Sequence, residues 1–252
     1  MQESTPIYLD WTFWAALLSF VAIVLSQLPP VYILLRPKRL EVEVHSRIRI
    51  NNMVGNPNAS IVLSIRNTGG RALRVSSLTL QLTRDGSSLV TLPGLSYYET
   101  PTSQTAVIFV PFTLQPGDTW SRFTLFFNEF DRQTEKLYRQ SVSALTADVN
   151  ERIAARDSSD NQPVCAAPEL VAPFHSMFEK FFLWHPGEYV ATLQVKAEPG
   201  SASFAKQYRF TLYESDTQEL VSNTKDYKFG GGIYYQVADH TGVYVPISEH
   251  RS

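Results

Sequence analysis

Three side chains between residues 175 and 185 have the types and spacing of metal ligands. His175 and Glu179 are four residues apart, so on a helix they would share one face, and His185 follows soon after. A zinc site also needs a fixed tetrahedral geometry, and the chain has no H-E-x-x-H motif to impose one. We therefore expect ordinary surface or packing histidines, and we predict neither a metal site nor a cofactor.

Nucleophiles and phosphate loops give no clearer signal. Cys165 is the only cysteine, and its irregular surroundings favour a small filler residue over a catalytic thiol. The chain has no G-x-S-x-G motif and no Walker-type loop. Gly230-Gly231-Gly232 is more typical of a flexible turn than of a phosphate cradle. We predict no catalytic residues and a non-enzymatic protein; an enzyme would need a deep polar pocket that gathers several carboxylates or histidines from across the fold.

Composition limits the classes of partner and compartment. The 252 residues carry a formal net charge of −2, with more acidic than basic side chains after residue 39. Such a domain has no electrostatic reason to attract a polyphosphate, so we predict no nucleic-acid partner. A single cysteine excludes an intrachain disulfide and agrees with a reducing compartment.

The N-terminal region contains a long apolar run. Residues 11–35 include no charged side chain, and a transmembrane helix needs roughly 20 such residues. Pro29-Pro30 should end or kink that helix, and its aromatic side chains suit the membrane interfaces. A cleavable signal peptide is the alternative, but no basic residue precedes the run. We predict a signal-anchor helix in the lipid bilayer, with a span that includes Trp11, Trp14, Leu18, Val24, Leu28 and Tyr32.

The charges that flank this run predict its orientation. Arg36, Lys38 and Arg39 follow it directly, which by the positive-inside rule places the N-terminus outside and the C-terminal domain in the cytoplasm. We therefore predict a single-pass protein of the inner membrane; the alternative leaves the C-terminal domain outside the cell. Small residues spaced three or four apart in the run would also permit a homo-oligomer through the anchor, although such spacing is common by chance. They are Ala15, Ser19, Ala22 and Ser26.

After residue 40 the apolar residues alternate with polar ones, which is typical of strands with one wet face. The parity of the pattern changes at Ser76-Ser77, which predicts a bulge or strand break. Asp85-Gly86 predicts a tight hairpin turn, and Pro111 predicts a sheet edge. Seven or eight such strands predict a mainly β fold with two antiparallel layers.

Three short turns carry a resemblance. The run 65–75, IRNTGGRALRV, resembles a turn of immunoglobulin-like domains in bacterial surface and membrane proteins, and the runs 114–118 and 185–189 are similar to other turns of that group. The resemblance implies an immunoglobulin-like β-sandwich over residues 40–215 and no particular activity. The Cys…Trp…Cys pattern of antibody-type domains is absent.

Residues 128–184 interrupt the strand pattern. Apolar residues at helical spacing from Tyr138 to Ile153 predict one helix, and an aromatic-rich run predicts a second. This helical insertion either caps the sandwich, lies in the membrane interface, or offers a partner groove. Its candidate partner surface is Phe174, Phe178, Phe181, Phe182 and Trp184.

The predicted organisation is therefore a short tail (1–10), a transmembrane helix (11–35), the sandwich (40–215) with its insertion (128–184), and a C-terminal extension (216–252). The preferred function is a membrane-anchored binding or scaffolding protein whose cytoplasmic domain recruits or senses a protein partner. The alternative is a subunit that faces the periplasm or cell exterior and binds or assembles envelope components.

Overall fold

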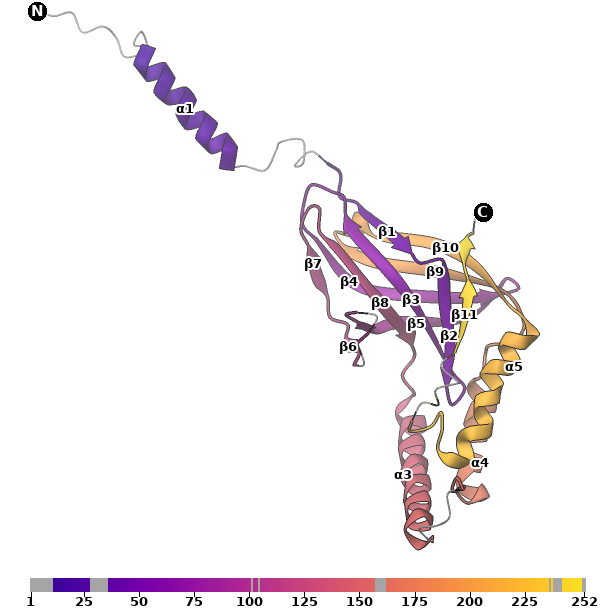
Figure 1. Cartoon of the computed structure of the whole chain (residues 1–252). Coiled ribbons are helices and arrows are strands. Elements are labelled where there is room, and N and C mark those ends of the chain that lie inside the picture. Colours follow the sequence, from indigo (N-terminus) through magenta and orange to yellow (C-terminus); the bar gives the residue numbers. More distant parts are fainter. Residues whose placement is uncertain are drawn as a thin grey trace, which may run out of the picture.

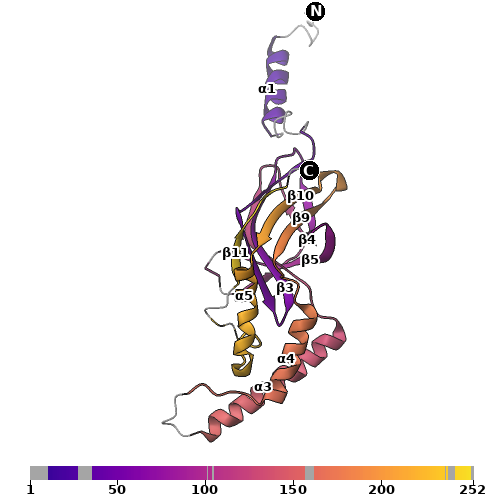
Figure 2. The same ribbon diagram turned by 90° about the vertical axis from the view of Figure 1, so that its right-hand side faces the viewer.

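The structure is a computed structural model that describes residues 11–27, 36–100, 102–103, 105–156, 162–235, 237 and 242–250. A curved antiparallel sheet forms its main body, and the helices between residues 132 and 222 extend from one end of that sheet (Figure 1). In the view turned by 90°, the helices lie beyond the end of the sheet and do not cover its broad faces (Figure 2). The helices are α1 (Trp11–Gln27), α3 (Arg132–Ala155), α4 (Pro168–Phe181) and α5 (Glu214–Ser222).

All the named strands belong to one sheet. Its main path runs in the order β11-β2-β3-β8-β5-β4-β9-β10-β12, while β1 pairs with β3, β6 with β5, and β7 with β4. The strands are β1 (Leu40–Val44), β2 (Arg47–Met53), β3 (Asn56–Asn67), β4 (Leu73–Arg84), β5 (Ser87–Tyr98), β6 (Val107–Ile108), β7 (Phe112–Leu114), β8 (Thr119–Phe127), β9 (Gly187–Glu198), β10 (Phe204–Leu212), β11 (Val243–Pro246) and β12 (Ser248–Glu249).

Strand β5 makes the sheet continuous. Its first half pairs with β4, its second half pairs with β8, and the register shifts between Gly94 and Ser96. A Cβ atom at Gly94 would lie 3.0 Å from Leu78 Cβ and 3.2 Å from the ring of Phe126. The bend therefore requires a residue without a side chain at this position.

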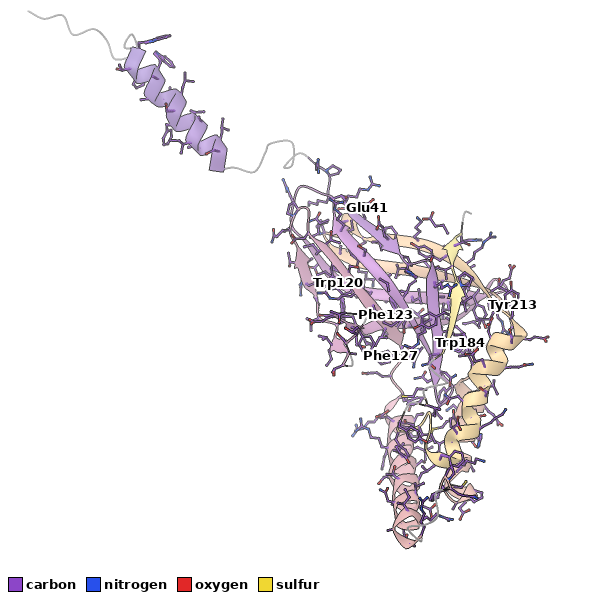
Figure 3. All side chains as sticks on the ribbon, in the orientation of Figure 1. Glu41, Trp120, Phe123, Phe127, Trp184 and Tyr213 are labelled. Carbon is purple, nitrogen blue, oxygen red and sulfur yellow. The ribbon has the colours of Figure 1, made fainter. Side chains whose placement is uncertain are left out.

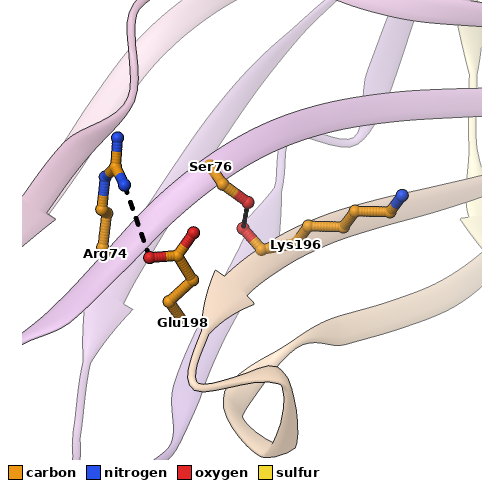
Figure 4. Close-up of polar contacts among 4 residues, drawn as sticks. All are labelled: Arg74, Ser76, Lys196 and Glu198. Atoms are coloured by element: carbon orange, nitrogen blue, oxygen red, sulfur yellow. Dashed lines mark hydrogen bonds and ion pairs between the residues drawn. The ribbon is translucent and has the colours of Figure 1, made fainter.

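Two local predictions are confirmed. The register between β4 and β9 shifts between Val75 and Ser77, where the parity of the sequence changes. Figure 4 shows Ser76 Oγ donating to the carbonyl of Lys196 at 3.2 Å, beside the ion pair between Arg74 and Glu198. The β4–β5 hairpin turns at Asp85-Gly86, where both residues have positive φ, as a type I′ turn requires.

The last described segment nearly closes the sheet. Residues 243–246 pair with β2 as β11, and Ile247 N–H donates to the carbonyl of Ser46 at 2.9 Å. Directly afterwards, Ser248 and Glu249 pair with Arg209 and Tyr208 of β10. One short segment therefore connects the two ends of the strand order, through a ladder of only two residue pairs on the β10 side.

The mainly β prediction is confirmed, but the two-layer immunoglobulin-like sandwich is wrong. A sandwich has two separate sheets, whereas here a single curled sheet passes through β5 and nearly closes on itself. Alternating apolar residues define an inner and an outer face in both architectures. The pairing of β5 with strands on both sides decides between them, and alternation does not encode that pairing.

The prediction of a membrane span over residues 11–35 is also corrected. In the described part of the chain, no helix combines the length and apolar character needed to cross a membrane. Helix α1 has 17 residues, about 26 Å at 1.5 Å per residue, against a hydrocarbon core of ~30 Å. Trp11, Trp14, Leu18 and Val24 lie on α1, while Leu28 and Tyr32 fall outside the described residues.

Three further predictions depended on that span. They are the signal-anchor assignment, the single-pass inner-membrane location, and the orientation with an outer N-terminus and a cytoplasmic domain. All three are wrong for the same reason. The uncharged run extends over 25 residues of sequence, but the helix of the described residues covers only Trp11 to Gln27.

Helices α3 and α4 occupy the range of the predicted insertion. Asp131 caps α3 by accepting hydrogen bonds from the N–H groups of Gln133 and Thr134. The hydrogen bond from the Thr134 hydroxyl, followed by those from the N–H groups, lowers the pKa of this carboxyl. Asp148 of α3 accepts the N–H of Ala167 at 2.9 Å and pairs with Arg152. The Ala167 hydrogen bond is the main reason why the pKa of Asp148 is lowered. Both carboxylates therefore hold the helices in place.

Candidate functional site

The curled sheet leaves an open groove between β1 and β10. Its volume is about 760 Å³, and we call it the edge groove. Glu41, labelled in Figure 3, marks the β1 side, at the end of the sheet remote from α3 and α4. The groove is lined by residues 39–46 together with Phe204, Lys206, Tyr208, Ile247 and Glu249.

The backbone of β1 turns one of its two hydrogen-bonding edges toward this groove. Thr68 N–H donates to the carbonyl of Arg39, and His45 N–H donates to the carbonyl of Val62. Because hydrogen-bonded pairs alternate along an antiparallel ladder, the odd-numbered residues of β1 bond to β3. The N–H and C=O groups of Leu40, Val42 and Val44 therefore point away from β3, toward the edge groove.

Strand β10 forms the opposite wall of the groove. It pairs with β9 along its whole length, but among the described residues β12 pairs with it only at Tyr208 and Arg209. His250 N–H donates to the carbonyl of Gln207, so odd-numbered residues of β10 face the β12 side. The backbone groups of Ala205 consequently face the groove beyond the end of β12.

The side chains of β1 divide into an apolar and an acidic row, and Arg39 and Lys206 add two cations elsewhere in the lining. Leu40 and Val42 are buried in the core of the curled sheet, whereas Glu41 and Glu43 alternate with them and are exposed. On the opposite wall, Tyr208 is buried and Phe204 packs against the core. A strand placed in the groove would therefore meet an apolar interior on one face and two carboxylates on the other.

An ion pair stands at the closed end of the groove. Lys206 Nζ pairs with Glu249 Oε1, and the same ammonium lies 6.0 Å from the ring centroid of Tyr208. Burial, and secondarily the charge of Glu249, raise the pKa of Tyr208 to about 12. The ion pair joins β10 to β12, whose ladder has only two residue pairs.

The edge groove is narrower than the space needed by a strand that hydrogen-bonds to both walls. Cα atoms of β1 and β10 approach within 8 Å at their nearest pairs. Paired strands lie ~4.8 Å apart, so a strand bonded to both walls needs about twice that separation. Among the described residues β1 and β10 do not pair with each other, and they would have to move apart to accept a guest strand bonded to both.

A second hollow of about 430 Å³ lies on the outer face of the sheet. Tyr98 and Phe123 stack there with centroids 6.0 Å apart, and Arg49 and Tyr244 also line it. Arg49 already has a polar interaction within the chain. This outer-face hollow offers aromatic surface without an open backbone edge, so it provides a useful comparison for the edge groove.

The aromatic residues predicted as a partner surface are mostly part of the core. Phe174 and Trp184 are fully buried, and Phe178 and Phe182 are nearly so; Phe181 is partly exposed. Trp184 Nε1 donates to the carbonyl of Asn51 at 2.8 Å, which ties the segment after α4 to β2. These rings join the helices to the sheet, and four of the five offer almost no surface to a partner.

The other residues singled out from the sequence do not converge. His175 lies against the ring of Tyr227, His185 against that of Phe182, and Cys165 is exposed and free. Within the described ranges, no three His, Cys, Asp or Glu side chains are grouped to hold a metal ion. Of the three basic residues at 36–39, Arg39 lines the edge groove and its carbonyl fixes the start of the β1–β3 ladder.

The edge groove itself was not predicted. The alternation of Leu40, Glu41, Val42, Glu43 and Val44 predicted a strand with one wet face, and this strand exists as β1. Whether an edge is paired depends on partners more than 150 residues away in the sequence. The one available signal was the pair of exposed glutamates, since charged residues are frequent on open edge strands.

Comparisons with known proteins leave the family open. No protein-family model matches the chain, and no curated protein matches it. Among solved structures, it is similar to a protein from Archaeoglobus fulgidus at 11% identity, over 68% of this chain and 98% of that one, with a TM-score of 0.30. A likeness this distant carries no argument about function.

Proposed function

We propose that this protein is a non-enzymatic binding protein that captures an extended segment of a partner protein by strand addition in the edge groove. The observation that carries the proposal is the backbone of β1, whose Leu40, Val42 and Val44 turn their N–H and C=O groups toward the groove. An open edge of this kind is a template for another strand, and several peptide-binding domains use one.

The side chains around the groove define the chemistry of the guest segment. A guest paired with β1 points alternate residues toward Leu40 and Val42, where apolar side chains become buried. Its other residues lie beside Glu41 and Glu43, where each opposite charge contributes roughly 0.2–1 kcal/mol. The expected guest is therefore an extended run of about five residues in which apolar residues alternate with Lys or Arg.

The closed end of the groove permits the widening that a guest requires. The β10–β12 ladder has two residue pairs, and the ion pair between Lys206 and Glu249 is partly exposed. Exposed ion pairs contribute about 1 kcal/mol or less. A movement of β10 away from β1 therefore breaks few interactions, and the pairing of β1 with the guest offsets them.

The direct test uses a synthetic peptide of alternating Val and Lys, with a Val and Glu peptide of the same length as its control. Fluorescence anisotropy on the whole protein is expected to show saturable binding of the Lys peptide, weakened by added salt, and little binding of the Glu peptide. The double variant E41K/E43K should reverse this preference. Equal binding of both peptides by both proteins would contradict the proposal.

A further inference from the structure

A smaller hollow lies at the helical end of the molecule, where the β2–β3 hairpin meets the segment that follows α5. Its volume is about 230 Å³. We call it the amide pocket, because it is lined by three asparagine side chains whose hydrogen bonding is incomplete among the described residues. Its defining residues are Asn51, Asn58, Asn223, Gly232, Tyr234 and Tyr235.

Two of the three asparagines face each other across the hairpin. Asn51 of β2 and Asn58 of β3 are directly opposite in the ladder, and both are partly buried. Asn51 Oδ1 accepts the N–H of Asn52 at 2.7 Å. Within the described residues, the Asn51 amide nitrogen and the whole Asn58 amide have no hydrogen-bond partner. The hairpin thus presents donors and an acceptor side by side.

Asn223 completes the set from the other wall. It begins the 3₁₀ helix η3 (Asn223–Phe229), its side chain is 6% exposed, and its Oδ1 atom has no hydrogen-bond partner among the described residues. A buried acceptor without a partner costs about 1–3 kcal/mol, so native structures rarely keep one without a reason. The Asn223 side chain lines the pocket, but its Oδ1 atom has almost no accessible surface and lies against Gly232.

The glycine run shapes the pocket around this acceptor. Gly232 has φ +73°, and a Cβ atom there would lie 2.6 Å from Asn223 Oδ1. The chain can therefore pass close to the amide only because position 232 has no side chain. The run Gly230-Gly231-Gly232 therefore lets the backbone pass close to the Asn223 amide.

A fourth asparagine shows what a purely structural role looks like. Asn52 is buried, its Nδ2 donates to the carbonyl of Leu220, and its Oδ1 accepts the N–H of Gly55. Both ends of its amide are therefore used within the chain. Asn51, Asn58 and Asn223 differ from it because they keep unused hydrogen-bonding capacity at one hollow.

The rest of the described lining is aromatic and aliphatic. Tyr234 and Tyr235 pack edge to face with centroids 5.3 Å apart, and both rings are about half exposed. No Asp, Glu, Lys, Arg or His side chain is among the described residues that line the pocket. Against these described residues a charged ligand would lose hydration without gaining an ion pair, so this part of the lining favours a neutral one.

We propose that the amide pocket binds a single neutral sugar or a related polyol. Each hydroxyl of such a molecule both donates and accepts, as do the three amides, and its C–H surface can pack on a tyrosine ring. The volume suits one sugar ring and is below the roughly 300–1,000 Å³ of sites for drug-sized molecules. This site is separate from the edge groove.

Saturation-transfer NMR with the whole protein tests the proposal. The probes are a panel of free pentoses, hexoses, N-acetylated hexosamines and sugar alcohols at millimolar concentrations. At least one should give a saturable signal, and N58A should weaken its binding by about tenfold, the effect of one or two lost hydrogen bonds. Asn150, exposed on α3, provides the matched control N150A, which should bind as the unaltered protein does.

Asn223→Leu removes the unpaired acceptor while keeping side-chain volume. It should abolish the sugar signal and leave the circular dichroism spectrum unchanged. The partly exposed N58A keeps the test valid if N223L fails to fold. No signal from any member of the panel, equal signals from N58A and the unaltered protein, or a crystal structure with ordered water only in the pocket would each overturn the proposal. Sugar binding should persist in V42P, so this proposal and strand addition can fail independently.

Discussion

Val42 on β1 lies directly opposite Ile65 on β3, at a position where the two residues do not hydrogen-bond to each other. The side chains of both point into the core, where Ile65 is fully buried and Val42 nearly so. The N–H and C=O of Val42 therefore point away from β3 into the edge groove. This residue has its side chain inside the fold and its backbone available to a partner.

Val42→Pro tests the free backbone edge of β1 without disturbing the fold. Proline removes the N–H that faces the groove, and is tolerated where that group is not part of a ladder. We expect V42P to fold and to lose binding of the Val and Lys peptide. V42A, which loses side-chain volume but keeps the N–H, should bind the peptide as the unaltered protein does.

Glu43→Pro is the complementary change. Position 43 pairs with Ser64, and its N–H belongs to the β1–β3 ladder. Chemical denaturation should show a loss of about 1–3 kcal/mol for E43P, because a carbonyl of β3 loses its donor. A V42P protein that binds the peptide normally, or one that unfolds like E43P, would contradict the assignment of the two backbone edges.

Tyr208 predicts how stability changes in alkaline solution. Burial and the charge of Glu249 raise its pKa from its usual value of 10.0 to about 12. Below pH 10 the phenol is protonated in both the folded and unfolded chains. Between pH 10 and 12 only the unfolded chain releases the proton, so the free energy of unfolding falls as pH rises. A pKa difference of about two between the folded and unfolded chains lowers the free energy of unfolding by about 2–3 kcal/mol.

Denaturant titrations at pH 8 and pH 12 measure this contribution. Because other buried tyrosines also titrate, the comparison is between the unaltered protein and Y208F. Between these two pH values the free energy of unfolding should fall less in Y208F than in the unaltered protein, by about 2–3 kcal/mol. Parallel losses in both proteins would show that Tyr208 titrates normally.

Tyr227 and Tyr138 provide a pair of opposite predictions. Tyr227 is fully buried, and its hydroxyl has no hydrogen-bond partner within the described residues. The hydroxyl of Tyr138 donates to the carbonyl of Ile233 at 2.7 Å. Thermal or denaturant unfolding should show Y227F more stable by about 1 kcal/mol and Y138F less stable by a similar amount. Destabilisation by Y227F would mean that its hydroxyl has a partner.

Gly94→Ala tests the bend that makes the sheet continuous. The added methyl group would contact Leu78 and the ring of Phe126 at 3.0 and 3.2 Å. We expect a loss of about 1–3 kcal/mol, the usual cost of overpacking a core. The control is G200A, where a Cβ meets nothing within 4 Å, and its stability should change little. Equal effects of the two substitutions would exclude a special role for Gly94.

Local features of the fold follow from the sequence because they depend on neighbouring residues. The bulge near Ser76 and the turn at Asp85-Gly86 are encoded within a few positions, and the structure confirms both. The closure of the sheet is different, because it depends on Ser248 and Glu249 meeting Arg209 and Tyr208. No periodicity specifies which strands will be neighbours, so the sequence predicted a sandwich where one sheet curls.

The same distinction explains the candidate sites. The aromatic run from Phe174 to Trp184 has the composition of an interface, yet most of its rings are buried because α4 packs against η3 and the β2–β3 hairpin. The edge groove and the amide pocket depend on backbone direction and on contacts between distant segments. The only local signs of these two sites in the sequence were Glu41 and Glu43 on one strand and the glycines at 230–232.

Residue-resolved amide hydrogen exchange, with and without the Val and Lys peptide, shows whether the peptide pairs with the free edge of β1. Glu41 and Glu43 should already be protected by β3, while Leu40, Val42 and Val44 should exchange rapidly in the free protein. We expect the peptide to protect these three even-numbered amides and to leave the outer-face hollow around Tyr98 and Phe123 unchanged. Protection at that hollow, with the three amides still exchanging rapidly, would contradict strand addition at β1.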